Sequence, residues 1–236
     1  DTRSTASLTS RDEYVGYNFD GGMSLQVGRM ATAGKNIEKD PYIATFLETR
    51  STVANSRTAN EYGSSGFVND IAQLKMKAGA ANITVQFGPS EYTDSNNGHI
   101  ALAVTGKAGG INYFASYNNG SADGNSLLAT YPSQSNMKLG GNMKFGSVKV
   151  GLMYTTMDKD GAPGADNATD SIFVDGDFSL GNDLSANVGF GTRSGDVAAD
   201  DATFMRLAVM KKLNKGASVY AGYTATDNDT ANTDTS

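Results

Sequence analysis

The chain has 236 residues, enough for one large β domain or two smaller ones, and it contains no cysteine, which excludes disulfides, thiolate metal sites and a cysteine nucleophile. Its net charge of -6 argues against nucleic acid as a partner. No apolar run approaches the roughly 20 residues that a membrane-spanning helix needs. Membrane-spanning strands are not excluded, because their apolar residues alternate with polar ones.

The first pair of predicted strands occupies residues 11–19 and 23–30, after a loop-like stretch at 1–10. Apolar and polar residues alternate in both strands, and the Asp20-Gly21-Gly22 sequence between them is typical of a tight hairpin turn. The sequence therefore predicts that residues 11–19 and 23–30 form a β-hairpin.

A long segment without alternation follows, from about residue 31 to residue 66. Connections of this length are uncommon in compact domains and are usually functional. Asp40 is a natural N-cap and Pro41 suits the first helical position. Ile43, Phe46 and Leu47 would then share one apolar face, with Glu48 on another. We expect a short helix here that ends by about residues 50–52.

The rest of the chain repeats one pattern of paired alternating segments. Tight turns centre near residues 20, 79, 109, 146, 182 and 215, and long polar loops separate the pairs. This gives a prediction of twelve strands, with short connections at one end and long loops at the other. That asymmetry is typical of bacterial outer-membrane barrels.

The hairpin at 137–154 shows what the two faces of these strands carry. One face is apolar, and the other carries lysines, glycines and amides. Aromatic residues of the apolar face gather near the strand ends: Phe19, Phe145 and Phe178 before short turns, and Phe87, Tyr117, Tyr154, Phe190 and Tyr223 at the loop end. Two aromatic rows around an aliphatic middle favour an all-β, transmembrane, antiparallel up-and-down barrel. A soluble β-sandwich is the alternative, with the apolar face towards a dry core.

Several short motifs carry a resemblance to a known family. They are RDEYVGY at 11–17, the Asp-Gly-Gly turn, SLQVGRM at 24–30 and the long loop with its short helix. On these, the chain resembles the general porins of Gram-negative outer membranes. The resemblance implies a sixteen-stranded barrel, of which about twelve strands, the fourth to the fifteenth, are represented here. We therefore expect one porin domain over 1–236, which is part of a longer chain; a self-contained twelve-stranded barrel is the alternative.

The same resemblance implies what the protein does and where. The expected function is passive diffusion of ions and small hydrophilic solutes through the bacterial outer membrane. The expected assembly is a homotrimer, surrounded by the lipid bilayer and lipopolysaccharide, without enzymatic activity or a cofactor. A surface adhesin or structural barrel with a blocked lumen is the alternative function.

The resemblance also implies that the loop at about 31–66 folds into the barrel and narrows the pore, with carboxylates facing basic residues of the wall. Glu48 and Glu38 are the loop candidates for this constriction, and Arg29 and Arg11 are the wall candidates. Arg29 alternates in phase with the apolar residues 23, 25 and 27, so only a β-bulge would turn it inward.

Further pore-lining residues follow from the alternation alone. A charge facing lipid at the middle of the bilayer would cost roughly 2–4 kcal/mol, so charged strand residues should face water. The expected lining residues are Lys75, Lys77, Lys138, Lys144, Lys149, Asp175, Asp177, Arg193 and Arg206.

No metal or catalytic site is expected. His99 is the single histidine, and no known catalytic motif is present. Acidic residues gather in two long loops: Asp158, Asp160, Asp166 and Asp170 in one, and Asp196, Asp200 and Asp201 in the other. Their spacing matches no dedicated calcium loop, so we interpret them as solubilising charge.

Overall fold

The computed structural model describes residues 12–35, 37–40, 42, 45, 47, 67–88, 98–121, 133–160, 167–196, 201–214 and 216–228. All regular secondary structure in this part of the chain is β. No helix with the length and hydrophobicity to cross a membrane is found among these residues.

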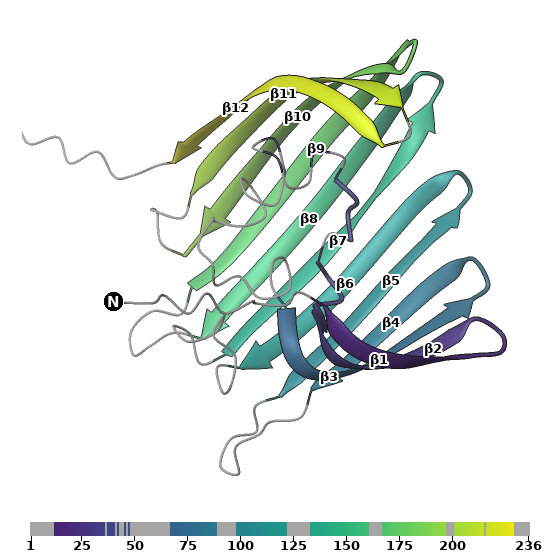
Figure 1. Ribbon diagram of the computed structural model, residues 1–236. Helices are drawn as coiled ribbons and strands as arrows, with labels where there is room; N and C mark the ends of the chain where they lie inside the picture. Colours follow the sequence, from purple (N-terminus) through teal and green to yellow (C-terminus); the bar gives the residue numbers. More distant parts are fainter. Residues whose placement is uncertain are drawn as a thin grey trace, which may run out of the picture.

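The strands are antiparallel and form a single sheet in which neighbours in sequence are neighbours in space (Figure 1). They are β1 (Glu13–Phe19), β2 (Met23–Ala31), β3 (Phe67–Ala78), β4 (Ala81–Gly88), β5 (His99–Ala108), β6 (Ile111–Ser121), β7 (Ser133–Phe145), β8 (Val148–Asp160), β9 (Asn167–Gly181), β10 (Leu184–Gly195), β11 (Ala202–Asn214) and β12 (Ala217–Asn228). The prediction of twelve up-and-down strands is confirmed. The alternative of a sandwich is wrong, because the described strands form one sheet rather than two packed ones.

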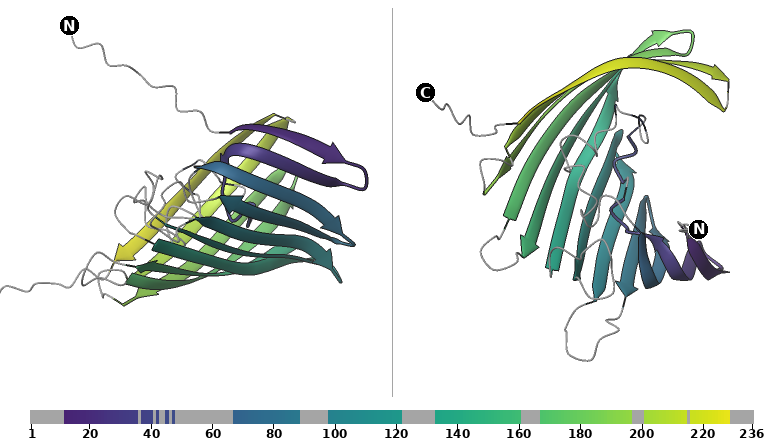
Figure 2. Two further views of the ribbon diagram at one scale, coloured as in Figure 1. Left: turned by 90° about the horizontal axis from the view of Figure 1, so that it is seen from below. Right: turned by 60° about the vertical axis from the view of Figure 1, so that its left-hand side comes forward.

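The sheet curves strongly, as two views in Figure 2 show. The tight turns all lie at one end of the strands (Figure 1). In the turn between β7 and β8, Gly146 has a φ of 60°, a left-handed conformation that glycine adopts without steric cost. The predicted asymmetry between short turns and long connections is therefore present.

The two faces of the sheet differ in the side chains that they carry. Directly paired residues share a face, so Leu139 lies beside Ala115 and Tyr154, whereas Lys138 lies beside Ser116 and Thr155. Leu139 is 43% exposed and Lys138 is 0% exposed. We call the face of Leu139 the outer face and the face of Lys138 the inner face.

The outer face is apolar along its whole width. Its exposed side chains include Val15, Leu25, Val27, Leu102, Leu139, Leu152, Val174 and Leu207 in the strand centres, and Phe19, Phe87, Tyr117, Phe145, Phe178, Phe190 and Tyr223 nearer the ends. Soluble monomers rarely expose a contiguous apolar patch above a few hundred Å². The outer face is therefore suited to an apolar environment rather than to water.

The inner face mixes polar groups with a few buried aromatic rings. Phe173 of β9 lies 5.8 Å from Phe204 of β11, measured between ring centroids. It fits because Gly189 on the intervening β10 has no side chain: a Cβ there would lie 2.5 Å from Cζ of Phe173. This glycine therefore leaves room for the ring of Phe173, whose centroid lies 5.2 Å from Cζ of Arg206.

Candidate functional site

The chain that leaves β2 crosses the inner face before β3 begins. We call its described residues, 32–35, 37–40, 42, 45 and 47, the crossing segment. Figure 2 shows this part of the chain inside the curve of the sheet. The connection between β2 and β3 runs from residue 32 to residue 66, close to the expected 31–66. The crossing segment is held to the sheet at places far apart along it.

The first attachment is made by amide side chains of β4 and β6. Oε1 of Gln86 accepts the backbone N–H of Ala33 at 2.8 Å, and Nε2 of Gln86 donates to the carbonyl of Ala31 at 2.8 Å. Oδ1 of Asn118 accepts the backbone N–H of Gly34 at 3.3 Å. Gln86 and Asn118 are both 0% exposed, so these bonds satisfy groups that water does not reach.

Gln86 is itself positioned by a buried polar row. Its Nε2 donates to Oε1 of Gln73 at 2.8 Å, and Nε2 of Gln73 donates to Oε1 of Gln26 at 2.6 Å. Nε2 of His99 lies 3.0 Å from Oε1 of Gln86. His99 is 4% exposed. The single histidine is thus part of the polar network behind the first attachment.

The second attachment is an ion pair between β7 and the crossing segment. Nζ of Lys138 lies 3.4 Å from Oε2 of Glu38, and it donates to the carbonyl of Gly34 at 3.4 Å. The side chains of Lys138 and Glu38 are 0% and 8% exposed. The structure therefore brings together one expected lining residue and one expected constriction residue.

The third attachment centres on Arg206 of β11. Nη1 lies 3.3 Å from Oδ1 of Asp40 and donates to the carbonyl of Leu47 at 3.0 Å. Nε donates to Oδ1 of Asn187 at 2.7 Å, and Nη2 lies 3.8 Å from Oδ2 of Asp175. Arg206 is 1% exposed, and two carboxylates and two neutral acceptors compensate its buried charge.

Aromatic rings flank the guanidinium group. Cζ of Arg206 lies 4.9 Å from the ring centroid of Tyr42 and 5.2 Å from that of Phe173. Burial raises the pKa of Tyr42 to about 12, with a further contribution from the charge of Asp177. Tyr42 is therefore an uncharged phenol near neutral pH, and it closes the crossing-segment side of the Arg206 site.

The crossing segment ends its described path against β11 and β12. Leu47 is 0% exposed and packs with Tyr42 and Ala208. A Cβ at Gly222 of β12 would lie 2.9 Å from Cδ2 of Leu47. The crossing segment therefore reaches from β4 to β12, across most of the width of the sheet.

Asp40 has a role that the sequence did not reveal. It was expected as a helix cap, and its Oδ1 does accept the backbone N–H of Tyr42 at 3.0 Å. Its ion pair with Arg206 joins residues 166 positions apart, and no local pattern signals it. Most of the predicted helix from Pro41 lies outside the described residues, and so does Glu48.

The other expected lining residues of the strands also lie on the inner face, as the alternation predicts. Nζ of Lys149 lies 2.6 Å from Oδ2 of Asp177, and Lys144 pairs directly with Lys149. Lys75 lines a cavity together with Gln26 and Gln73, and Lys77 lies two residues further along the same strand. Arg193 pairs with Ser171, which is buried on the inner face.

Arg29 is placed differently from the expectation. A register shift does lie between Gly28 and Met30, but Gly28 pairs with Ile71 and Met30 with Val68, so the extra residue is on β3. Arg29 stays in register with Glu13, beside the outer-face pair Val15 and Val27.

The contacts of Arg29 agree with this placement. Its Nη1 donates to Oδ1 of Asn69, and its guanidinium lies 5.9 Å from the ring centroid of Phe67. The structure does not bring Arg29 to the Glu38 and Asp40 attachments. Arg11, the other expected wall residue, lies outside the described residues. No group of three or more His, Asp or Glu side chains that could hold a metal ion is found where the structure describes the chain.

Comparisons with known proteins agree with this architecture. A family model described as Gram-negative porin matches residues 1–231. No curated protein matches the chain.

Solved structures share the fold at low sequence identity. OmpF of Salmonella typhi, in a complex with daunomycin, is similar with a TM-score of 0.69 and 14% identity, over 91% of this chain and 70% of that one. OmpT, an outer membrane protein of Vibrio cholerae, is similar with a TM-score of 0.62 and 18% identity, over 87% of this chain and 66% of that one. A porin refined at 1.8 Å resolution is similar with a TM-score of 0.58 and 12% identity, over 92% of this chain and 86% of that one. The chain therefore has the porin fold and spans 66–86% of the length of these proteins.

Proposed function

Because the chain belongs to the Gram-negative porin family, we propose that it forms a passive diffusion channel for ions and small hydrophilic solutes in the bacterial outer membrane. The observation that carries this proposal is the contrast between the two faces of the sheet. The outer face is apolar, and the inner face holds charged and amide side chains against a crossing segment.

The outer face supports a location within lipid. Burying apolar surface away from water is worth roughly 25 cal/mol per Å², and every strand offers such surface. The opposite orientation, with the charged face towards hydrocarbon, would cost roughly 2–4 kcal/mol for each lysine or arginine near the middle of the bilayer. We therefore assign the outer face to the bilayer and the inner face to water. A homotrimer, with lipopolysaccharide around it, is the assembly that the family suggests.

We assign the narrowing of the channel to the crossing segment. Its attachments to Gln86, Lys138 and Arg206 support this assignment, because they hold the chain across the lumen side of the sheet. Glu38 contributes by fixing the segment. Glu48 and Arg11 remain proposed constriction residues from the sequence, as do the inner-face lysines 75, 77, 144 and 149 as lining residues.

The test is electrical recording from the full chain reconstituted in a planar lipid bilayer. We expect stepwise increases in current that are proportional to voltage, because an open water-filled pore conducts without chemistry. Reconstituted protein that gives no steps would contradict the channel function. It would favour a barrel with a closed lumen whose exposed loops bind a partner.

A further inference from the structure

Basic residues dominate the inner face, although the chain as a whole is acidic, with a net charge of -6. The register of the strands places these basic residues there: Lys75, Lys77, Lys107, Lys138, Lys144, Lys149, Arg193, Arg206 and Lys212. The acidic side chains of the same face, in the described strands, are Asp175 and Asp177. The net charge of the inner face of the described strands is therefore opposite in sign to the charge of the whole chain.

The described acidic groups of the crossing segment do not offset this excess in the open lumen. Glu38 is paired with Lys138, and Asp40 is paired with Arg206, in contacts that are almost fully buried. Both carboxylates thus hold the segment in place, and each is paired with a basic side chain of the sheet. Each pair is close to electrically neutral, so among the described residues the remaining charges set the potential that a solute meets.

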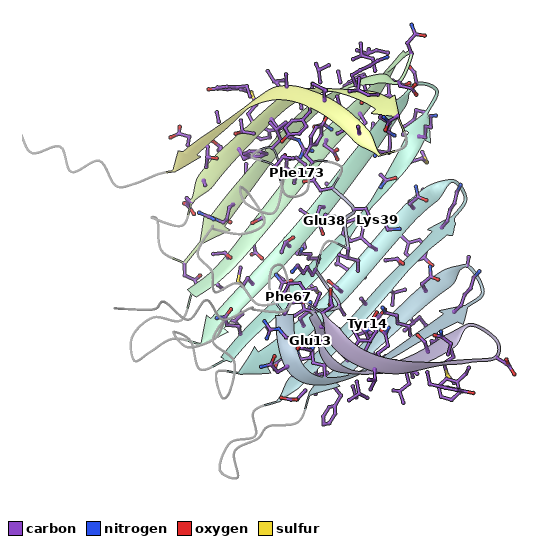
Figure 3. All side chains as sticks on the ribbon, viewed as in Figure 1. Glu13, Tyr14, Glu38, Lys39, Phe67 and Phe173 are labelled. Carbon is purple, nitrogen blue, oxygen red and sulfur yellow. The ribbon has the colours of Figure 1, made fainter. Side chains whose placement is uncertain are left out.

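Lys39 lies between these two fixed residues and is itself exposed. Its φ of 55° is a left-handed conformation, which is uncommon for a residue other than glycine and is maintained where the surrounding structure enforces it. Here ion pairs of the two neighbouring residues, Glu38 and Asp40, flank it on both sides. Figure 3 shows Glu38 and Lys39 next to each other over the middle of the inner face.

Two cavities meet at Lys39. The larger one has a volume of about 490 Å³ and is lined by Lys39, Lys107 and Lys149, by Asn112 and Asn142, and by one acidic residue, Glu38. The smaller one has a volume of about 50 Å³ and is lined by both signs of charge: Lys39, Lys149 and Arg206, and Glu38, Asp40 and Asp175.

Within the described residues, Lys149 is paired with Asp177, whereas no ion pair is found for Lys39 or Lys107. An anion that enters the larger cavity therefore meets the ammonium groups of Lys39 and Lys107 and amide donors, whereas the acidic residue there, Glu38, is paired with Lys138.

We propose that the channel prefers small anions, such as chloride, phosphate and short carboxylates, and that Lys39 is the residue that determines this selectivity. The proposal rests on the channel function proposed above. A unit charge about 10 Å from a solute in water changes the local concentration of a monovalent ion about two-fold. Because this change is opposite for chloride and potassium, removing the charge of Lys39 should reduce the permeability ratio of chloride to potassium by a factor of about four, and reversing it by about sixteen.

The experiment measures the reversal potential of the reconstituted full chain across a gradient of potassium chloride. The variants are Lys39→Gln, Lys39→Glu and, as a matched control, Lys211→Gln. Lys211 pairs with Leu184. It is an odd number of positions from Arg206 on the same strand, so its side chain is on the outer face and its charge is outside the lumen. Single-channel conductance recorded in the same membranes shows that each variant has folded and inserted.

The expected result is an anion-preferring wild type, stepwise loss of that preference in the two Lys39 variants, and no change in Lys211→Gln. A conducting wild type that prefers cations or neither ion would overturn the proposal and leave the channel function intact. Reversal potentials that are equal in wild type and Lys39→Glu would overturn the role of Lys39. A wild type without conductance would instead overturn the channel function and the selectivity with it.

Discussion

Arg206 on β11 and Asp40 on the crossing segment form an ion pair with 3.3 Å between Nη1 and Oδ1, and their side chains are 1% and 2% exposed. A buried pair of this kind contributes little net stability compared with apolar residues, but breaking it leaves a buried charge uncompensated. Its contribution here is positional, because it fixes where the crossing segment lies on the inner face.

The first prediction concerns Asp40→Asn. The change keeps a cap for the N–H of Tyr42 but removes the charge that faces Arg206. Loss of one partner of a buried pair costs roughly 3–5 kcal/mol, and we expect about 3 kcal/mol because Asp175 remains 3.8 Å from Nη2. Urea unfolding in lipid vesicles measures the loss. Asp20→Asn, in the exposed first turn, is the control and should change stability by less than about 0.5 kcal/mol.

The second prediction is that Lys138 and Glu38 are energetically coupled. Either Lys138→Met or Glu38→Gln alone leaves a buried group without its partner, whereas the double variant removes both. We expect the double variant to be more stable than the sum of the single effects implies, with a coupling energy of about 1–3 kcal/mol. A double-mutant cycle of unfolding free energies measures this coupling. Strict additivity would show that the contact at 3.4 Å contributes nothing.

The third prediction concerns Gln86→Met, which keeps the side-chain volume and removes the amide. The N–H of Ala33 and the carbonyl of Ala31 would lose a buried partner, at roughly 1–3 kcal/mol for each unsatisfied group. Gln26→Met, at the more exposed end of the same amide row, is the matched control and should cost less. The order of the two unfolding free energies is the outcome to measure, and a larger cost at Gln26 would contradict the attachment described for Gln86.

The fourth prediction tests the assignment of the outer face. Leu139→Lys places a charge in the middle of the outer face and should cost roughly 2–4 kcal/mol when the chain folds into lipid. Asn112→Lys adds the same charge on the inner face, where Asn112 lines the larger cavity, and should cost far less. Equal costs in a vesicle-folding titration would argue against lipid contact at Leu139.

The strands were predictable because their pattern is local. Alternation over about ten residues, with a turn sequence such as Phe145-Gly146-Ser147, is sufficient to define a hairpin and its two faces. The expected lining residues Lys138, Lys149 and Arg206 follow from that alternation alone, and the register places each on the inner face.

The attachments of the crossing segment were not predictable in the same way. Lys138 and Glu38 are 100 residues apart, and Arg206 and Asp40 are 166 apart, so neither pairing appears in any local window. Arg29 shows a related difficulty. A bulge near it was expected, but the extra residue is on the neighbouring strand, where Asp70 adopts a φ of 55°, and the sequence of β2 does not reveal this.

The most direct test of the central claim, that the crossing segment lies across the open lumen, uses the absence of cysteine from the chain. Lys39→Cys places a single thiol on the exposed part of the segment, and Lys211→Cys places one outside the lumen. An uncharged, thiol-reactive polyethylene glycol is then added during single-channel recording. We predict that modification reduces the conductance of Lys39→Cys in discrete steps and leaves Lys211→Cys unchanged. Unaltered conductance in Lys39→Cys after confirmed labelling would contradict the account.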